Sequence, residues 1–93
     1  MKWMEIIRLC ALDRLRQTDV MELLRQLQTE LSTADVTCTL YQRATVATDI
    51  SIHLVWHSDI LEHNKSLLGA KLVYLLQEFG SVDYSVWIEK LSL

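Results

Sequence analysis

Four residues of the sequence carry side chains that can bind and activate a small organic molecule: Tyr41, Arg43, His53 and Trp87. An arginine can hold an anionic oxygen, a tyrosine or histidine can move a proton, and a tryptophan can stack on a ring. All four lie in stretches of alternating polarity, and the alternation places them on one face of a sheet. We therefore take His53, Tyr41 and Arg43 as candidate catalytic groups and Trp87 as a candidate ligand-binding residue. Aromatic residues and arginine also concentrate at protein interfaces, and this enrichment favours an interface over catalysis.

The histidines add further candidates. His53 and His57 have the spacing HxxxH, which on a helix would place both beside one metal ion. On a strand, four residues span about 13 Å, so the pair cannot share an ion, and no metal site is expected. His57 then lines the same face as His53. His63 and Asn64 follow in a polar stretch and are also candidates for ligand binding, with a solvated loop as the alternative.

The sequence lacks the motifs that mark several other kinds of chemistry. The sequence has no CxxC pair, glycine-rich phosphate loop or GxSxG motif, so we expect no nucleotide site, hydrolase triad or cofactor. Cys10 and Cys38 fall on the first and second predicted strands, which a third strand separates in the expected sheet. Their distance would be about 9–10 Å, beyond the reach of a disulfide. Both are predicted to be free, buried thiols.

The size and composition bound the remaining possibilities. The 93 residues make a single domain, 1–93, yet 51% of them are hydrophobic and the mean hydropathy is +0.16. This is more apolar surface than a small monomer easily hides, so we expect a homodimer. The formal net charge of −3 and the absence of a basic cluster argue against nucleic acid as a partner. The sequence contains no apolar run of about 18 residues, so no membrane span is predicted. The charged residues near the N-terminus argue against a secretory signal, so a cytoplasmic location is expected.

The elements that must position the candidates follow from periodicity. Residues 19–33 and 66–79 repeat apolar positions with the period of a helix. Thr18 is the predicted N-cap of the first helix, preceded by a connector at 11–17 that could equally form a first helical turn. Ser66 is the predicted N-cap of the second helix, and Gly80 its stop at a positive φ. The apolar stripe of the second helix is predicted to contain Leu67, Leu68, Leu72, Leu75, Leu76 and Phe79.

Four other stretches have the pattern of β-strands, namely 3–10, 36–44, 50–57 and 82–89. The second and third are joined by a turn at 45–49 and predict a hairpin. Residues 58–65 are predicted to be a loop or a short helix. The resulting order, β-α-β-β-α-β, predicts an α+β, ferredoxin-like sandwich: a four-stranded antiparallel sheet, in the order 4-1-3-2, with two helices on one face.

The strand patterns also assign the two faces of the sheet. The aliphatic sets that should face the helices are Val36/Cys38/Leu40, Ile50/Ile52/Leu54 and Val86/Ile88. Trp56 is expected on this same face. The opposite face then carries the four candidate residues among threonines, histidines and serines. Such a face is too polar for a dry core and too aromatic for a plain solvent surface, so it suits a wet cavity or the seam between two sheets.

The order of elements, the length, and the segments IHLVWHSD and SLLGAKLVYLLQEFGSVDYSVWIE resemble the dimeric α/β-barrel superfamily, and within it the antibiotic biosynthesis monooxygenase-like domains. The resemblance implies a dimer in which two sheets pack through their open faces, with a pocket in each subunit. Members include cofactor-free quinone-forming oxygenases and haem-degrading enzymes. The latter use an Asn, a His and a Trp, which points to Asn64, His63 and either Trp56 or Trp87.

Two hypotheses about function follow, and the residues leave open whether the protein is an enzyme. The first is a cofactor-free monooxygenase or isomerase that acts on a small aromatic compound in the pocket of a homodimer. The second is a non-catalytic module of the same fold that binds a small ligand or a partner. Haem binding or degradation is a third and weaker alternative.

Overall fold

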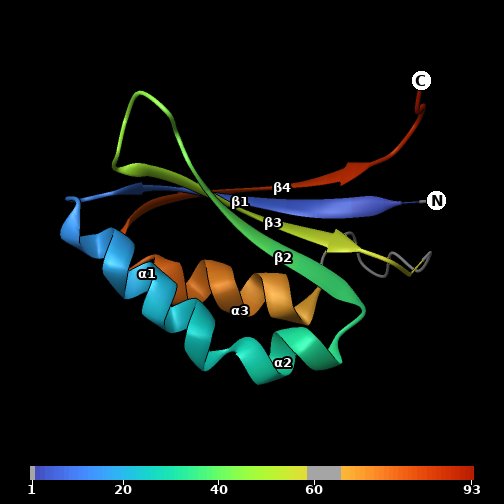
Figure 1. Ribbon diagram of the computed structural model, residues 1–93, viewed down its shortest axis with the longest axis horizontal. Coiled ribbons are helices and arrows are strands. Elements are labelled where there is room, and N and C mark those ends of the chain that lie inside the picture. The colour runs from blue at the N-terminus through green and yellow to red at the C-terminus, as the bar shows by residue number, and fades with distance from the viewer. Residues whose placement is uncertain (1, 59–65) are drawn as a thin grey trace.

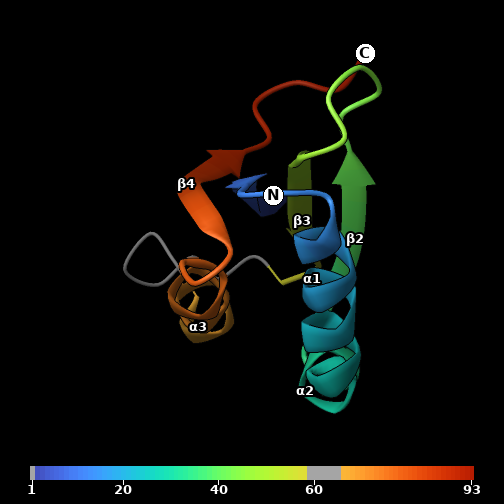
Figure 2. The same ribbon diagram turned by 90° about the vertical axis from the view of Figure 1, so that its left-hand side faces the viewer.

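The computed structural model describes residues 2–58 and 66–93, in which a four-stranded antiparallel sheet lies over three helices (Figure 1). The helices occupy one side of the sheet, and α2 continues the course of α1 while α3 lies apart from them (Figure 2). The other face of the sheet is uncovered, and we call it the open face. In chain order the elements are β1 (Trp3–Ala11), α1 (Leu15–Gln26), α2 (Gln28–Thr33), β2 (Val36–Gln42), β3 (Asp49–Trp56), α3 (Leu67–Leu76) and β4 (Gly80–Ile88).

The sheet has the strand order β2-β3-β1-β4, which confirms the predicted arrangement 4-1-3-2. All three pairings are antiparallel, and β1 lies at the centre between β3 and β4. The register places Ile7 of β1 beside Ile52 of β3 and Tyr84 of β4. The α+β ferredoxin-like fold predicted from the sequence is therefore confirmed.

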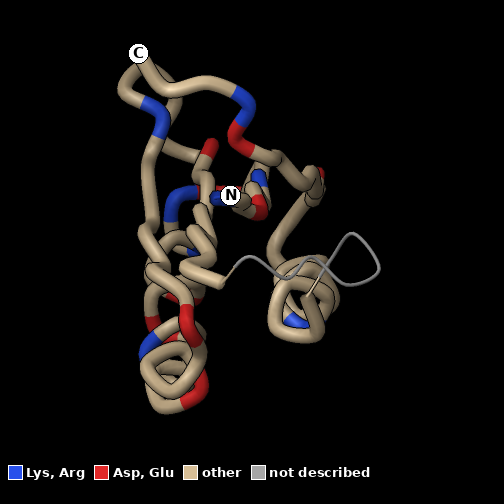
Figure 3. Tube along the Cα trace, turned by 90° about the vertical axis from the view of Figure 1, so that its right-hand side faces the viewer, with Lys and Arg blue, Asp and Glu red and all other residues tan. Residues whose placement is uncertain are grey.

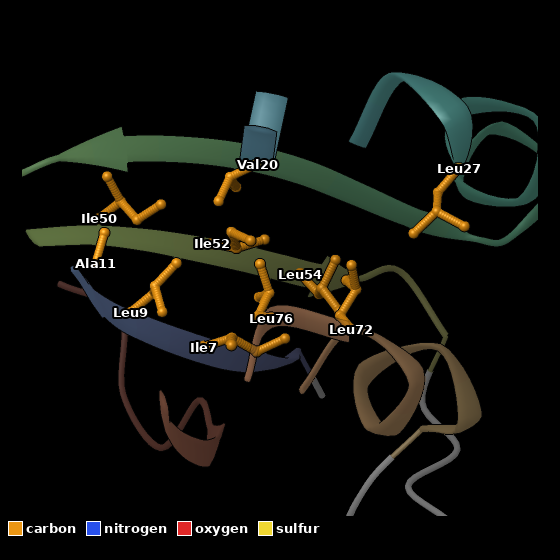
Figure 4. Close-up of a cluster of buried hydrophobic side chains, with 10 residues drawn as sticks. All are labelled: Ile7, Leu9, Ala11, Val20, Leu27, Ile50, Ile52, Leu54, Leu72 and Leu76. Carbon is orange, nitrogen blue, oxygen red and sulfur yellow. The ribbon is translucent and has the colours of Figure 1, made fainter. Parts of the chain in front are cut away.

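The core lies between the sheet and the helices (Figure 4). Alternate residues of β1 and β3 point into it because side chains of a strand alternate between its faces. Helices α1 and α3 supply the opposite wall through Val20, Leu72 and Leu76, all of which are fully buried. The ten residues of the buried cluster are Ile7, Leu9, Ala11, Val20, Leu27, Ile50, Ile52, Leu54, Leu72 and Leu76.

The first predicted helix differs from the observed one at its start and in its middle. It begins at Leu15 rather than after Thr18, because the Asp13 carboxylate accepts hydrogen bonds from the N–H groups of Leu15 and Arg16 at 2.9 and 3.2 Å. An aspartate satisfies the free N–H groups of a first turn as well as a threonine does. The predicted range 19–33 is also divided at Leu27, whose φ and ψ of −91° and 3° lie outside the helical region and whose side chain is buried in the core.

The second helix begins as predicted. The Ser66 hydroxyl accepts a hydrogen bond from the Gly69 N–H at 2.8 Å, which confirms Ser66 as the N-cap of α3. The buried face of α3 runs through Gly69, Leu72 and Leu76. Leu67 is 93% exposed, so its place in the apolar stripe was wrongly predicted. At about 3.6 residues per turn, a position two residues before Gly69 points to the opposite side of the helix.

Charged residues of both signs are interspersed over the sheet and the helices (Figure 3). One pair links two helices, since the Lys71 ammonium of α3 lies 2.8 Å from the Glu30 carboxylate of α2. Among the described residues, no helix is long and apolar enough to cross a membrane. Both cysteines are free, as predicted, but only Cys38 is partly buried; Cys10 is exposed because it alternates with Leu9 and lies on the open face.

Gly80 has a different role from the one predicted. Its φ lies outside the left-handed region, and α3 already ends at Leu76. Gly80 is instead the first residue of β4, where it lies against the end of β1. A Cβ atom at this position would come within 2.1 Å of the Cys10 carbonyl oxygen and 2.9 Å of the Ala11 Cα atom. Glycine is therefore required by the close approach of two backbones.

We predict that Gly80→Ala lowers the free energy of unfolding by about 1–3 kcal/mol, the usual cost of forcing extra volume into a packed site. The obstructing atoms belong to the backbone of β1, so they cannot move aside as a flexible side chain could. Urea denaturation followed by circular dichroism measures the change. The neighbouring Ser81→Ala variant, at an exposed position, is the control and should change stability by less than about 0.5 kcal/mol. Equal stabilities of the two variants would contradict the proposed close approach.

Candidate functional site

The structure brings two of the predicted catalytic candidates together on the open face. Tyr41 of β2 and His53 of β3 are in contact, with ring centroids 4.6 Å apart and planes inclined by 50°. The His53 Nε2 atom also shares a hydrogen bond of 2.9 Å with the Ser51 hydroxyl. Tyr41 is 51% exposed and His53 is partly buried, so the histidine is held between neighbours while the tyrosine remains accessible.

Arg43 lies at the end of the same two strands. Its guanidinium forms an ion pair of 2.9 Å with the Asp49 carboxylate. The hydrogen bond from Arg43 holds the pKa of Asp49 below its usual value, and a second hydrogen bond from Cys10 acts in the same direction. Conversely, the hydrogen bond to Asp49 and its negative charge raise the pKa of the Cys10 thiol. A raised pKa makes the thiolate, which is the nucleophilic form, scarcer than at an ordinary cysteine.

A hollow of about 250 Å³ lies beside Tyr41 and Arg43, and His53 borders it only through its contacts with Tyr41 and Ser51. Tyr41, Arg43 and Ser51 line one side of it, and Arg8 of β1 lines the other. Arg8 was not among the predicted candidates, although its strand parity puts it on the open face at the centre of the sheet. The hollow therefore combines an aromatic wall, two cations and a hydroxyl that is bonded to His53. Its complete lining is Arg8, Tyr41, Gln42, Arg43, Asp49, Ile50 and Ser51.

Trp87 faces the same side of the sheet but does not join this group within one chain. It lies on β4, and Tyr41 lies on β2 at the opposite edge of the sheet. Trp87 pairs with Met4, which in turn pairs with Val55, so its surroundings are apolar. Its indole N–H donates to the Ser85 hydroxyl at 2.8 Å, and the side chain is 55% exposed. A second hollow, of about 260 Å³, is lined by Trp87 and its apolar neighbours.

The remaining candidates are less well placed. His57 is exposed, and its Nε2 atom lies 2.7 Å from the Thr37 hydroxyl at the end of the hairpin strands. His63 and Asn64 lie outside the described residues, so the implied haem contacts stay a prediction. Trp56 faces the helices, as predicted, where its ring stacks on Trp3. Among the described residues, no three acidic, histidine or cysteine side chains come together as metal ligands would.

Sequence reasoning missed a second polar site, which lies on the helix-covered face around Glu5. This residue is completely buried. Its carboxylate accepts hydrogen bonds from the Trp56 indole N–H at 2.6 Å, from the Ser66 hydroxyl at 2.6 Å and from the Ser66 backbone N–H at 3.2 Å. The Tyr84 hydroxyl donates a fourth. We call Glu5, Trp56, Ser66 and Tyr84 the Glu5 cluster.

The Glu5 cluster also explains Gly69, the buried glycine in the first turn of α3. A Cβ atom at Gly69 would lie 2.1 Å from the Glu5 Oε2 atom. Glycine therefore allows the positive end of α3 to approach the carboxylate, an arrangement that stabilises negative charge. Tyr84 responds to the same carboxylate: burial, the hydrogen bond to Glu5 and the negative charge of Glu5 all raise the pKa of its phenol.

A signal for this cluster was present in the sequence. Glu5 alternates in phase with Ile7 and Leu9, and Tyr84 alternates in phase with Val82 and Val86, so both had to face the helices. A carboxylate on a buried face requires hydrogen-bond donors. The donors on β3, β4 and α3 follow Glu5 by 51 to 79 positions, however, and only the fold shows that they converge.

Solved structures with the same arrangement of elements are known. A conserved protein from Methanosarcina mazei matches with a TM-score of 0.73 at 14% identity, over 97% of this chain and 94% of that one. Rv0793 from Mycobacterium tuberculosis matches with a TM-score of 0.69 at 17% identity, over 99% and 98%. A variant of SnoaB, a cofactor-independent oxygenase from Streptomyces nogalater, matches with a TM-score of 0.70 at 8% identity, over 99% and 96%.

The fold is that of the antibiotic biosynthesis monooxygenase-like domains. The resemblance seen in the sequence is thus confirmed at the level of the fold. No protein-family model matches the chain, and no curated protein is similar to it in sequence. Because a shared fold does not carry a function with it, the reaction and its residues have to be argued from the site.

We predict that the Tyr84 phenol loses its proton at a higher pH than an ordinary tyrosine, whose pKa is about 10. Because folding raises this pKa, the stability linked to the group is intact below about pH 10 and is lost as the pH rises further. The difference in ultraviolet absorbance between the parent protein and Tyr84→Phe during alkaline titration isolates this phenol. Glu5→Gln should move its titration back toward the ordinary pH, whereas Tyr74→Phe, at an exposed tyrosine of α3, should leave it in place. A Tyr84 phenol that titrates at or below the ordinary value would contradict the prediction.

Proposed function

We propose that the protein is a homodimer formed through the open faces of two sheets, and that it binds a small aromatic compound between them. We propose further that it acts on this compound as a cofactor-independent oxygenase. The observation that carries the proposal is the hollow on the open face, which is lined by Arg8, Tyr41 and Ser51. His53 lies beside it, in contact with Tyr41 and hydrogen-bonded to the Ser51 hydroxyl. The shared fold with SnoaB, which is a cofactor-independent oxygenase, supports it.

The composition of the open face supports the dimer. Met4, Ile6 and Val55 are only partly buried although they lie at or beside the centre of the sheet, and Trp87 is more than half exposed beside them. An uncovered patch of this kind on a small protein usually marks a contact surface. A second copy would cover both the apolar side and the polar hollow, so a ligand held there would be shielded from water.

The residues of the hollow can share the work of such a reaction. A phenolic substrate would stack on Tyr41 and give its hydroxyl proton to His53 through the Ser51 hydroxyl. The resulting phenolate would lie beside the Arg8 guanidinium. The electron-rich phenolate can itself reduce dioxygen. One oxygen atom enters the ring and the other leaves as water, so that a phenol and O₂ give a quinone and H₂O. All the electrons come from the substrate, and His53 needs only to accept and return protons.

A second candidate function is a non-catalytic binding module with the same dimer. Much of the polar surface of the open face is already bonded within the chain: Arg43 to Asp49, His57 to Thr37, and Trp87 to Ser85. Side chains that are fixed in this way suit an interface that must be preorganised. A ligand that binds tightly without being converted would favour this function.

The oxygenase proposal predicts oxygen consumption with a panel of polycyclic phenols in air, with formation of a quinone absorption band, and no product under anaerobic conditions. Replacing His53 by Gln should lower kcat by about 10²-fold or more, because it removes the proton acceptor. The matched control is His57→Gln, directly after the end of β3 and on the same face, which should retain most of the activity. Absence of turnover across the panel, or equal losses in the two variants, would contradict the proposal.

If the protein is a dimer, analytical ultracentrifugation at micromolar concentration should give the sedimentation coefficient of a particle that contains two chains. Trp87→Glu should weaken self-association about thirtyfold or more, since buried tryptophans at interface centres contribute about 2 kcal/mol or more. Tyr74→Glu is the control because Tyr74 is an exposed aromatic residue, at 74%, on the outer side of α3. A parent protein that sediments as a monomer would contradict the proposed dimer. If both substitutions weakened self-association equally, the interface would lie elsewhere.

A further inference from the structure

Three oxidisable aromatic side chains meet in and beside the Glu5 cluster, and the proposed chemistry of the open face uses none of them. Trp3 and Trp56 face the helices from β1 and β3, and Tyr84 faces them from β4. Indoles and phenols are the side chains most readily oxidised by one electron without a metal. Their arrangement around a single buried carboxylate therefore raises the question of where an electron and a proton could move.

The contacts form a continuous series. The rings of Trp3 and Trp56 are stacked, with centroids 5.3 Å apart and planes within 8° of parallel. The Trp56 indole N–H donates to the Oε1 atom of Glu5 at 2.6 Å, and the Tyr84 hydroxyl donates to the Oε2 atom of the same carboxylate. One carboxylate group thus separates the second indole from the phenol.

The phenol also has a place for its proton. A tyrosine that loses an electron becomes a strong acid, so it is oxidised easily only where an acceptor can take the phenolic proton. Glu5 accepts a hydrogen bond from this hydroxyl, which is the geometry that proton transfer requires. Burial and the charge of Glu5 raise the pKa of Tyr84, so the phenol cannot release its proton beforehand. The electron and the proton must therefore leave together.

The other end of the series reaches the surface. Trp3 is almost fully buried, yet it lines the hollow of about 260 Å³ to which the exposed residues Lys2 and Glu89 also belong, beyond the apolar patch of Met4, Val55 and Trp87. Its indole N–H donates to the Ser58 carbonyl oxygen at 3.1 Å, which fixes the ring. An oxidant in this hollow would meet Trp3 before it met any other member of the series.

We propose that Trp3, Trp56 and Tyr84 form a relay that carries an oxidising equivalent from the surface hollow to Tyr84, with Glu5 as the acceptor of the phenolic proton. In the complete step, a one-electron oxidant such as an organic peroxyl radical takes an electron from Trp3. Trp56 then gives an electron to the oxidised Trp3, and Tyr84 gives one to the oxidised Trp56. The products are the peroxide anion, a neutral Tyr84 radical and protonated Glu5. A small reductant of the thiol or ascorbate class returns the electron, and the proton moves back to Tyr84.

The relay does not depend on the proposed oxygenase activity, because Trp3, Trp56 and Tyr84 face the helices and none of them lines the hollow around Tyr41 and Arg8. The relay would reduce radicals that enter the hollow beside Trp3 and Trp87. The unpaired electron would then be held on the buried Tyr84, in a less reactive form and away from bound molecules. The alternative is that the Glu5 cluster only stabilises the fold. In that case a tryptophan radical formed at the surface would decay without producing a radical at Tyr84.

The test uses a protein in which Tyr84 is the only tyrosine and the exposed tryptophan has been removed, namely the triple variant Tyr41→Phe/Tyr74→Phe/Trp87→Phe. A photogenerated tris-bipyridine ruthenium(III) complex serves as the oxidant, and transient absorption distinguishes tryptophan from tyrosine radicals. We expect a tyrosine radical to appear as the tryptophan radical decays. Adding Trp56→Phe should slow its appearance about tenfold, which corresponds to about 1.4 kcal/mol in the barrier. In D₂O the transfer should be measurably slower, because a proton moves in the same step.

Two controls make the outcome decisive. Adding Tyr84→Phe must abolish the tyrosine signal and leave the tryptophan signal. Adding Glu5→Gln should suppress the tyrosine radical, since the amide cannot take up the proton, provided that circular dichroism shows a folded protein. If this variant does not fold, the D₂O measurement on the unaltered cluster decides the role of Glu5. A tyrosine radical that fails to form, that forms equally fast without Trp56, or that shows no slowing in D₂O would overturn the relay.

Discussion

The buried carboxylate of Glu5 ties together more of this fold than any other described polar group. It belongs to the central strand β1, and it accepts hydrogen bonds from Trp56 of β3, Tyr84 of β4 and both donors of Ser66 at the start of α3. Removing a carboxylate from water costs several kcal/mol, so Glu5 is stable there only while these donors surround it. The donors in turn fix where α3 begins. Ser66 can cap the helix and bind Glu5 at once because Gly69 leaves room for the carboxylate.

This constraint separates the two faces of the sheet into different environments. On the helix-covered face, every carboxylate oxygen of the cluster has donors, and the surrounding side chains are packed. On the open face, the same strand β1 presents Met4, Ile6 and Arg8, which alternate with Trp3, Glu5 and Ile7. The first face holds its polar groups rigidly in a dry setting. The second leaves Arg8, Tyr41 and Trp87 accessible, which is what binding of a ligand or of a second chain requires.

The fold could be predicted because its signals are local and repetitive. Periodicity identified every strand and both helical regions, and the short connections then allowed few sheet orders. Errors arose where two local signals competed, as at Thr18 and Asp13, since either residue could cap α1. They also arose where packing decided the outcome. The predicted helix is divided at Leu27, whose side chain is buried in the core, and no glycine or proline marks this division in the sequence. A glycine-specific conformation was predicted at Gly80, but glycine is needed there because the backbone of β1, far away in sequence, lies close to it.

The site was less predictable than the fold. Strand parity correctly placed Tyr41, His53, Arg43 and Trp87 on one face, because alternation needs no knowledge of neighbours. Whether two of them touch depends on register and strand order. The hairpin register brings Tyr41 against His53, whereas the sheet order sends Trp87 to the far edge. The Glu5 cluster depends entirely on such long-range pairing, which explains why composition alone did not reveal it.

Arg8 shows how the open face should behave when it is covered. It lies on the central strand with Ser51 and Asp83 as cross-strand neighbours, and its charge lowers the pKa of Asp49. A second sheet packed directly on it would remove water from a guanidinium, and such burial is costly without an anionic partner. In the proposed dimer, two open faces can therefore meet closely over Met4, Val55 and Trp87 but must leave room for water or an anion over Arg8. The proposed dimer would then be dry at one side and keep a polar cavity at the other, and the proposed phenolate has the charge and the ring that such a cavity can accommodate.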